Sequence, residues 1–182
     1  LTLAEKLAAG FQRGTPFPAV AAQRSAYQGA VELMRSPQGK VFDLTQEPAE
    51  AHDSYGKHYF GQGCLLARRL VETGVPFVEV YLGDWDTHEQ RRADMVRNEC
   101  LPASDQAMHA LITDLKDRGL LDDTLVIWGG EFGRTPVAQG KNGRDHNPEG
   151  FTMWMAGGGV MGGYRHGATD DYGYYAVEDK MH

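Results

Sequence analysis

Three short polar stretches of this sequence hold the residue types that bind metal ions in proteins. The first, GDWDTH, follows an apolar run that ends at Leu82, and the second, GGEFGRTP, follows an apolar run that ends at Trp128. The third, GRDHN, lies at the far end of the loop that the second one opens. The carboxylates and imidazoles of these stretches are Asp84, Asp86, His88, Glu131, Asp145 and His146.

A divalent cation accounts for this concentration of acidic and imidazole groups. Carboxylates within a few ångströms of one another do not all stay ionised unless a positive charge lies between them. Oxygen and imidazole ligands together suit zinc, manganese or calcium. Each residue taken alone has a simpler explanation, since Asp86 or Thr87 would cap the next helix and Asp145 would form an Asx-turn. The three stretches taken together favour the metal site.

Basic side chains in the same loop offer a way to hold an anion beside that cation. Arg134, Lys141 and Arg144 lie in this loop, and Thr135 follows the first of them. Guanidinium and ammonium groups next to a metal bind anionic esters and offset charge that develops on the ester oxygens during transfer. A solvated loop face is the competing interpretation of the same residues.

The sequence before the first polar stretch predicts a helix followed by a buried strand. Leucines at helical spacing form an apolar face over residues 62–73, and Gly74 supplies the C-terminal stop. Residues 75–82 are apolar except for Glu79, as expected of a strand covered on both faces in a parallel sheet.

The same order of elements is predicted before and after the second stretch. Apolar residues recur at three- and four-residue steps from Leu101 to Leu115, and Gly119 follows as a helix stop. Strands are predicted over residues 124–128 and, after the polar loop, over residues 151–156. Helices and strands that alternate with short connections predict an α/β sandwich with an at least partly parallel sheet. Ligands bind beyond the carboxyl ends of such strands, which is where the first two polar stretches lie.

The beginning of the chain is predicted to be peripheral to that sandwich. Residues 1–42 form a helical crossover segment within a single domain that spans residues 1–182. Asp43 and Thr45 predict the capped start of a short helix, which Gly56 ends.

Bulk composition excludes two classes of partner. The 182 residues carry a net charge of −7 and no run of Lys or Arg, so nucleic acid is not expected as a partner. No stretch is long and apolar enough to predict a membrane span. Cys64 and Cys100 fall in predicted helices without a second ligand at metal-binding spacing, so both are expected to be free and buried. The sequence gives no indication of oligomeric state.

Several motifs, in the same order along the chain, resemble the bacterial DUF1501 proteins. The resemblance covers nearly the whole chain from about Val41 onward. That family is similar to the alkaline phosphatase and sulfatase superfamily, so the resemblance implies a three-layer α/β/α sandwich with a mostly parallel sheet, incomplete in this chain. The motifs are FDLTQEP, FGQGCLLARRLVETGVPFVEV, GDWDTH, RGLLDDTLVIWGGEFGRTP, GRDHNP and AGGGVMGG.

The resemblance also implies a divalent metal centre that hydrolyses phosphate or sulfate esters, either small anionic esters or sulfated glycans. In the superfamily an Asp and a His four residues apart bind one metal, as Asp84 and His88 would here. Members of the family often carry glycine at the position of Asp84, which leaves Asp86 as the rival ligand. His146 matches the last superfamily histidine, and Asp145 lies beside it.

Two departures from the superfamily pattern bear on activity. Where the superfamily has Asp-His after the next strand, this chain has Glu131 followed by Phe132. The superfamily strand that carries the nucleophile has no match, so the attacking group is expected outside this chain. The resemblance implies an exported or periplasmic protein. A second hypothesis is therefore a non-catalytic exported domain whose degenerate metal site binds an ion or an anionic glycan.

Overall fold

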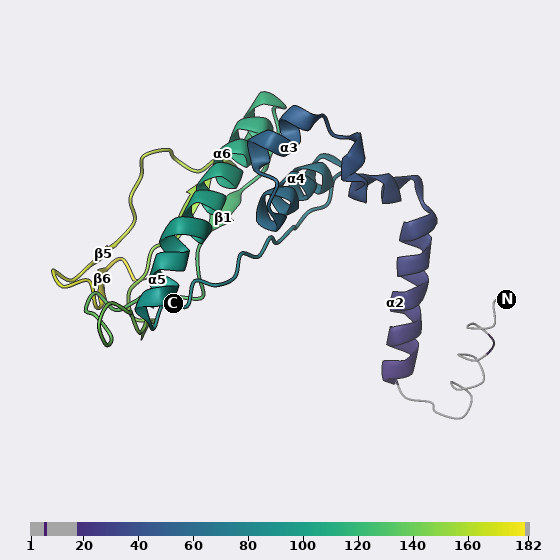
Figure 1. Ribbon diagram of the computed structural model, residues 1–182. Helices are drawn as coiled ribbons and strands as arrows, with labels where there is room; N and C mark the ends of the chain where they lie inside the picture. The colour runs from purple at the N-terminus through teal and green to yellow at the C-terminus, as the bar shows by residue number, and fades with distance from the viewer. Residues whose placement is uncertain (1–5, 7–17, 181–182) are drawn as a thin grey trace. The chain divides into compact units, whose positions relative to one another are not determined.

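The computed structural model describes Lys6 and residues 18–180 of the 182-residue chain. These residues form a mixed α/β structure of helices and short antiparallel strand pairs (Figure 1). The chain divides into two compact units, Leu1–Leu44 and Thr45–His182. In the part of the chain that is described, no helix combines the length and apolarity that crossing a membrane requires.

The first unit contains helix α2 (Pro18–Arg35) and the 3₁₀-helix η1 (Pro37–Phe42). Both elements fall within residues 1–42, for which the sequence predicts a peripheral helical crossover segment. The earlier part of that segment, apart from Lys6, lies outside the described residues.

The second unit contains the helices and strands that position the polar stretches. The 3₁₀-helix η2 (Leu44–Gln46) crosses the boundary between the two units. The helical elements that follow it are α3 (Ala49–Tyr55), α4 (Tyr59–Glu72), α5 (Gln90–Met95), the π-helical turn η3 (Val96–Cys100), α6 (Leu101–Asp117) and η4 (Leu121–Asp123). Its strands are β1 (Val126–Trp128), β2 (Gly133–Arg134), β3 (His146–Asn147), β4 (Trp154–Ala156), β5 (Ala168–Thr169) and β6 (Ala176–Glu178).

Helices α3, α4 and α6 pack against one another and enclose the core of this unit (Figure 1). Tyr55, Leu65 and Leu115 are buried there, each with an exposed fraction of 2% or less. Burying a side chain of this size stabilises the folded state by about 1.5–3 kcal/mol. Cys64 and Cys100 are buried and free, as predicted.

A charged group is buried within the same helices. Arg68 is 2% exposed, and its guanidinium lies 2.5 Å from Glu47 and 2.9 Å from Glu72. Its Nε lies 2.9 Å from Asp114 Oδ2, an ion pair that lacks the alignment of a hydrogen bond. Burial opposes the charged form of Arg68, but the hydrogen bonds and charges of the three carboxylates outweigh burial and raise its pKa. The network ties Glu47, two residues before α3, to α4 and α6.

The predicted helix ends are confirmed, whereas one predicted helix start is wrong. Gly56, Gly74 and Gly119 follow α3, α4 and α6 with positive φ angles of 87°, 89° and 70°, which glycine adopts without steric cost. Asp43 and Thr45 do not cap α3, whose N-cap position is Pro48. Proline disfavours helical backbone in the residue before it, so the helix begins after Pro48.

Helix α6 continues from α5 through the π-helical turn η3. Pro102 lies in the first turn of α6. A proline has no N–H to donate to the carbonyl four residues earlier, and its ring collides with that carbonyl in a regular helix. The wider turn at η3 relieves this conflict and lets one helical path run from residue 90 to residue 117.

The strands differ from the predicted parallel sheet. β1 pairs with β4, β2 with β3 and β5 with β6, each pair antiparallel, and no parallel pair occurs among the described residues. The strands predicted over residues 124–128 and 151–156 are confirmed as the β1–β4 pair, with Trp128 opposite Trp154. Helix-to-strand order along the chain indicates α/β structure but does not fix which strands pair.

The strand predicted over residues 75–82 does not form in the described structure. Val78 and Val80 line a hollow against α4, whereas Phe77 is 79% and Tyr81 is 78% exposed. The segment therefore has one half-buried face and one exposed face, and the prediction that both faces are covered is wrong. An apolar run signals burial, but a strand also requires a hydrogen-bonding neighbour, which the run itself does not specify.

Candidate metal site

The β2–β3 hairpin places two of the predicted site residues side by side. Arg134 on β2 is the register partner of His146 on β3. Beyond the strands, Thr135 N donates to Asp145 O at 2.9 Å, and Asp145 N donates to the Thr135 hydroxyl at 3.1 Å. At the other end, the buried Asn147 donates to the carbonyl of Tyr174 at 3.0 Å. The hairpin is thus fixed at both ends of its short ladder.

A second contact docks this hairpin against the first polar stretch. Arg144 N donates to the Thr87 carbonyl at 2.8 Å. Gly143 lies so close to the same stretch that a Cβ at this position would overlap the carbonyl of His88. Only glycine allows the two backbones to approach in this way. The contact joins residues more than fifty positions apart.

Asp86, His88 and His146 meet at the junction, and we call these three residues the ligand trio. His88 Nε2 lies 2.9 Å from Asp86 Oδ1 and 3.0 Å from His146 Nε2. His146 Nε2 lies 3.2 Å from the same oxygen of Asp86. The imidazole rings are stacked, with centroids 4.9 Å apart. Among the described residues, this is the group of carboxylates, imidazoles and thiols whose geometry suits a metal ion.

The hydrogen bond between Gln139 and His88 bears on which nitrogen of His88 could bind a metal. Gln139 Oε1 lies 2.6 Å from His88 Nδ1 and accepts a hydrogen bond from it in the tautomer that carries the proton on Nδ1. His88 Nε2 then presents a lone pair toward the ionised Asp86. A histidine that donates one ring N–H to an oxygen and turns the other nitrogen toward a carboxylate and a second imidazole has the arrangement of a metal ligand. A cation at the junction would satisfy all three inward-facing atoms.

The distances between the three inward-facing atoms of the ligand trio are close to those between ligand atoms around a small metal ion. Zinc binds imidazole nitrogen and carboxylate oxygen at about 2.0–2.2 Å, so tetrahedral ligand atoms lie about 3.3–3.5 Å apart. The observed separations of 2.9, 3.0 and 3.2 Å differ from that value by a few tenths of an ångström. Three protein ligands also leave a fourth position open, as in catalytic zinc sites.

Arg134 lies against the ligand trio. Its guanidinium donates to Asp86 Oδ1 at 2.6 Å and to Glu131 Oε1 at 3.3 Å. The hydrogen bond from Arg134 lowers the pKa of the Asp86 carboxyl below its usual range, with further help from the charges of His88, Arg134 and His146. Asp86 is therefore held ionised, which is the form that binds a metal.

The other predicted metal ligands are near the ligand trio but not part of it. Asp145 Oδ1 lies 3.8 Å from His88 Nδ1 and accepts a hydrogen bond from His146 N at 2.8 Å. Glu131 contacts the site through Arg134. Asp84 is exposed with a φ of 68°, outside the group that meets. Of the two carboxylates that the sequence leaves open as the ligand beside His88, Asp86 is the one that meets His88 and His146 in this geometry.

The predicted anion-binding residues also separate into two groups. Arg134 is at the ligand trio. The Thr135 hydroxyl donates to the carbonyl of Val137 at 3.0 Å and thereby stabilises the turn that follows β2. Arg144 directs its guanidinium to backbone oxygens of its own loop, with Gly143 O at 2.8 Å. Lys141 is exposed in the same loop.

Two residues at the site were not predicted to contact it. Gln139 orients His88, and the ring of Phe132 lies edge-on to the ring of His146 with centroids 5.2 Å apart. Nothing in the sequence marks Gln139, because an amide has no metal chemistry of its own and lies far from His88 along the chain. Phe132 was noted only as a replacement for a histidine.

The comparisons with known proteins identify a family but no characterised relative. A family model described as "Protein of unknown function (DUF1501)" matches residues 1–182. No curated protein and no solved structure matches the chain.

Proposed function

We propose that this chain, which belongs to the DUF1501 family, is a metal-dependent hydrolase of phosphate or sulfate esters, similar to alkaline phosphatases and sulfatases. The convergence of Asp86, His88 and His146 beside Arg134 carries the proposal. Export or a periplasmic location, and the three-layer α/β/α sandwich of that superfamily, are part of the same proposal and rest on the resemblance of the motifs.

Zinc or manganese is the metal that this donor set favours. Two imidazoles and one carboxylate suit either ion, whereas calcium takes six to eight oxygen ligands. A bound metal of this kind supplies Lewis-acid catalysis by polarising an ester oxygen. Asp145 and Gln139 would hold the histidine ligands in place, since both lie at hydrogen-bonding or near-hydrogen-bonding distance from them.

Arg134 is the residue that we assign to the anion. Its guanidinium carries five N–H donors, of which two are directed to Asp86 and Glu131. The planar fork matches two oxygens of a phosphate or sulfate group, and its charge would offset the negative charge that develops in transfer. Lys141 and Arg144 remain weaker candidates for the same role, and the attacking group is proposed to lie outside residues 1–182.

Turnover of aryl phosphates and aryl sulfates tests this function. The protein is assayed with zinc, manganese or calcium added after chelator treatment, together with His88→Ala. We expect turnover that depends on zinc or manganese and falls at least about 100-fold in His88→Ala. Turnover that is unchanged in His88→Ala would show a contaminating hydrolase and contradict the proposal.

A non-catalytic metal site is the second candidate, and Phe132 favours it. Its apolar ring contacts His146 where the superfamily resemblance implies an imidazole ligand. A site reduced to the ligand trio would then bind one ion and an anionic glycan without turnover. Tight binding of one zinc and of a sulfated oligosaccharide, with no hydrolysis of either ester class, would favour this alternative.

A further inference from the structure

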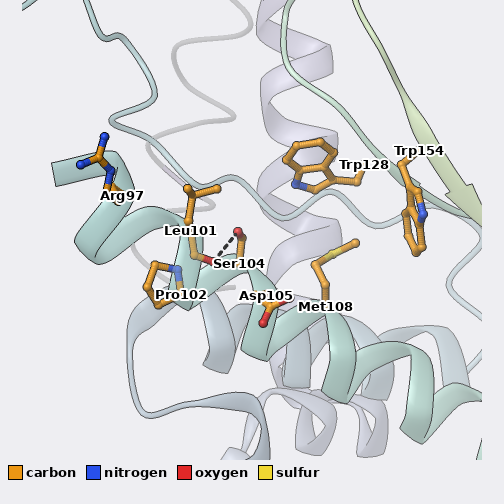
Figure 2. A pocket seen from close by; sticks show the side chains of 8 residues that line it. All are labelled: Arg97, Leu101, Pro102, Ser104, Asp105, Met108, Trp128 and Trp154. Carbon is orange, nitrogen blue, oxygen red and sulfur yellow. Dashed lines mark hydrogen bonds between the residues drawn. The ribbon is translucent and has the colours of Figure 1, made fainter. Parts of the chain in front are cut away.

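A cleft of about 640 Å³ lies between helix α6 and the β1–β4 pair (Figure 2). Trp128 and Trp154, register partners across the two strands, form one wall. Leu101, Ser104 and Met108 on α6 contribute to the other, at helical spacings that place them on one side of the helix.

The space between a helix and a strand pair is normally filled by side chains. Here Trp128 is 40%, Trp154 43% and Leu101 47% exposed, so apolar surface faces an open hollow. Its volume falls within the range of about 300–1,000 Å³ that small-molecule sites occupy. The hollow is thus large enough for a ring system and lined by residues that bind one.

The lining indicates a flat, largely apolar ring. Two indoles, a leucine, a proline and a methionine make most of the wall. The Ser104 hydroxyl already donates to the Leu101 carbonyl at 3.0 Å (Figure 2). Arg97 and Asp105 are exposed polar residues of the lining. Aromatic ligands stack on such indole faces or meet their edges, whereas a sugar would require more polar partners for its hydroxyls.

One contact relates this cleft to the ligand trio. The ring of Trp128 lies edge-on to that of Trp85, with centroids 6.3 Å apart and planes at 78°. Trp85 directly precedes Asp86 in the chain. The same strand that supplies Trp128 leads into the stretch containing Glu131 and Arg134. The contact between the two tryptophans thus links a wall of the cleft to the segment of the chain that carries Asp86.

We propose that this cleft binds an aromatic ring, the organic part of an aryl ester whose anionic part would be held at the ligand trio. The statement about the ester rests on the proposed function. The binding of the ring itself does not, because it needs no metal.

Calorimetric titration of the metal-free full chain with 2-naphthol, an uncharged aromatic probe, tests the inference. We expect saturable binding that weakens at least tenfold in Trp154→Ala, which removes one wall. Met108→Trp should weaken binding to a similar extent by filling the cleft. Because this substitution leaves both strands unchanged, it still tests the inference if Trp154→Ala does not fold. Far-UV circular dichroism checks the fold of each variant.

Two controls separate this inference from the proposed function. Tyr172→Ala alters a residue that is 79% exposed and does not line the cleft, so its affinity for 2-naphthol should equal that of the unaltered chain. His88→Ala should weaken metal binding strongly but keep the affinity for 2-naphthol. No saturable binding, or equal affinity in Met108→Trp, would overturn the inference. Binding of methyl β-glucoside without binding of 2-naphthol would also overturn the inference.

Discussion

At the scale of single residues, His88 is the position on which metal binding depends most. It contacts Asp86, His146 and Gln139 at once, at 2.9, 3.0 and 2.6 Å. We predict that His88→Ala weakens zinc affinity by more than about 100-fold, beyond the effect of losing a residue that only orients a ligand. Competition with a chromophoric chelator measures the affinity.

The matched control is His109, an exposed histidine. His109 lies on α6, outside the ligand trio. His109→Ala should bind zinc as the unaltered chain does. An equal loss of affinity in both variants would mean that zinc binds to scattered surface histidines.

Arg134 has a separate effect that is visible without metal. Because its hydrogen bond is the largest cause of the lowered pKa of Asp86, Arg134→Ala should raise that pKa toward its ordinary value. The carboxylate is then lost at a higher pH as the solution is acidified. Carbon-detected NMR titration of the metal-free protein measures this directly. Arg144→Ala serves as control, since that guanidinium contacts backbone oxygens, and a rise of equal size there would contradict the assignment.

At the scale of elements, the close contact between the β2–β3 hairpin and the first polar stretch positions the ligand trio. Gly143→Ala should push the two backbones apart, because its Cβ would overlap the His88 carbonyl. We predict a loss of zinc affinity of about tenfold or more in a protein that still folds. Gly162→Ala, where the added carbon meets open space, should leave the affinity unchanged. Equal affinities in the two variants would show that the contact does not matter.

The helical core depends on the buried ion network. Arg68→Ala removes the buried charge that joins Glu47 to Asp114, while Glu47 keeps its ion pair with Arg69 and Asp114 keeps its ion pair with Arg118. We therefore expect a loss of about 1.5–3 kcal/mol in the free energy of unfolding. Lys57→Ala removes an exposed pair with Asp53 and should cost less than about 1 kcal/mol. Urea unfolding followed by circular dichroism measures both. A loss below 1 kcal/mol for Arg68→Ala would mean that the network adds nothing to stability.

Local signals in the sequence predicted the helices better than the strands. Leucine spacing and the stops at Gly74 and Gly119 depend on neighbouring residues, so the ends of α4 and α6 were found. Strand pairing depends on residues far apart in the chain, and residues 75–82 therefore looked like a strand without forming one. Pro48 shows that even a local signal fails when a second one competes with it.

Residue types in the sequence predicted which stretches would form the candidate site. They did not predict which side chains within those stretches would meet. The first and third polar stretches meet at Asp86, His88 and His146, and the second stretch reaches them through Arg134. Side-chain direction separates these ligands from Asp84 and from the residues that only surround them. That direction is set by contacts such as the one at Gly143, which leave no pattern in a single sequence.

At the scale of the whole molecule, the proposed metal centre lies where the β2–β3 hairpin meets the loop that contains Asp86 and His88. A cation bound there would explain why acidic residues and histidines gather in a chain whose net charge is already −7. A cation at the ligand trio would also bind the folded state alone, and ligands that do so stabilise proteins in proportion to their occupancy. The charge argument and the predicted stabilisation both require that zinc binds to the imidazoles of His88 and His146.

Zinc K-edge X-ray absorption on the protein loaded with one equivalent of zinc tests this claim most directly. We predict a first shell of nitrogen and oxygen at about 2.0–2.1 Å with the multiple scattering of two imidazoles, reduced to one imidazole in His88→Ala. A first shell without imidazole, or zinc that is lost on gel filtration, would contradict the account.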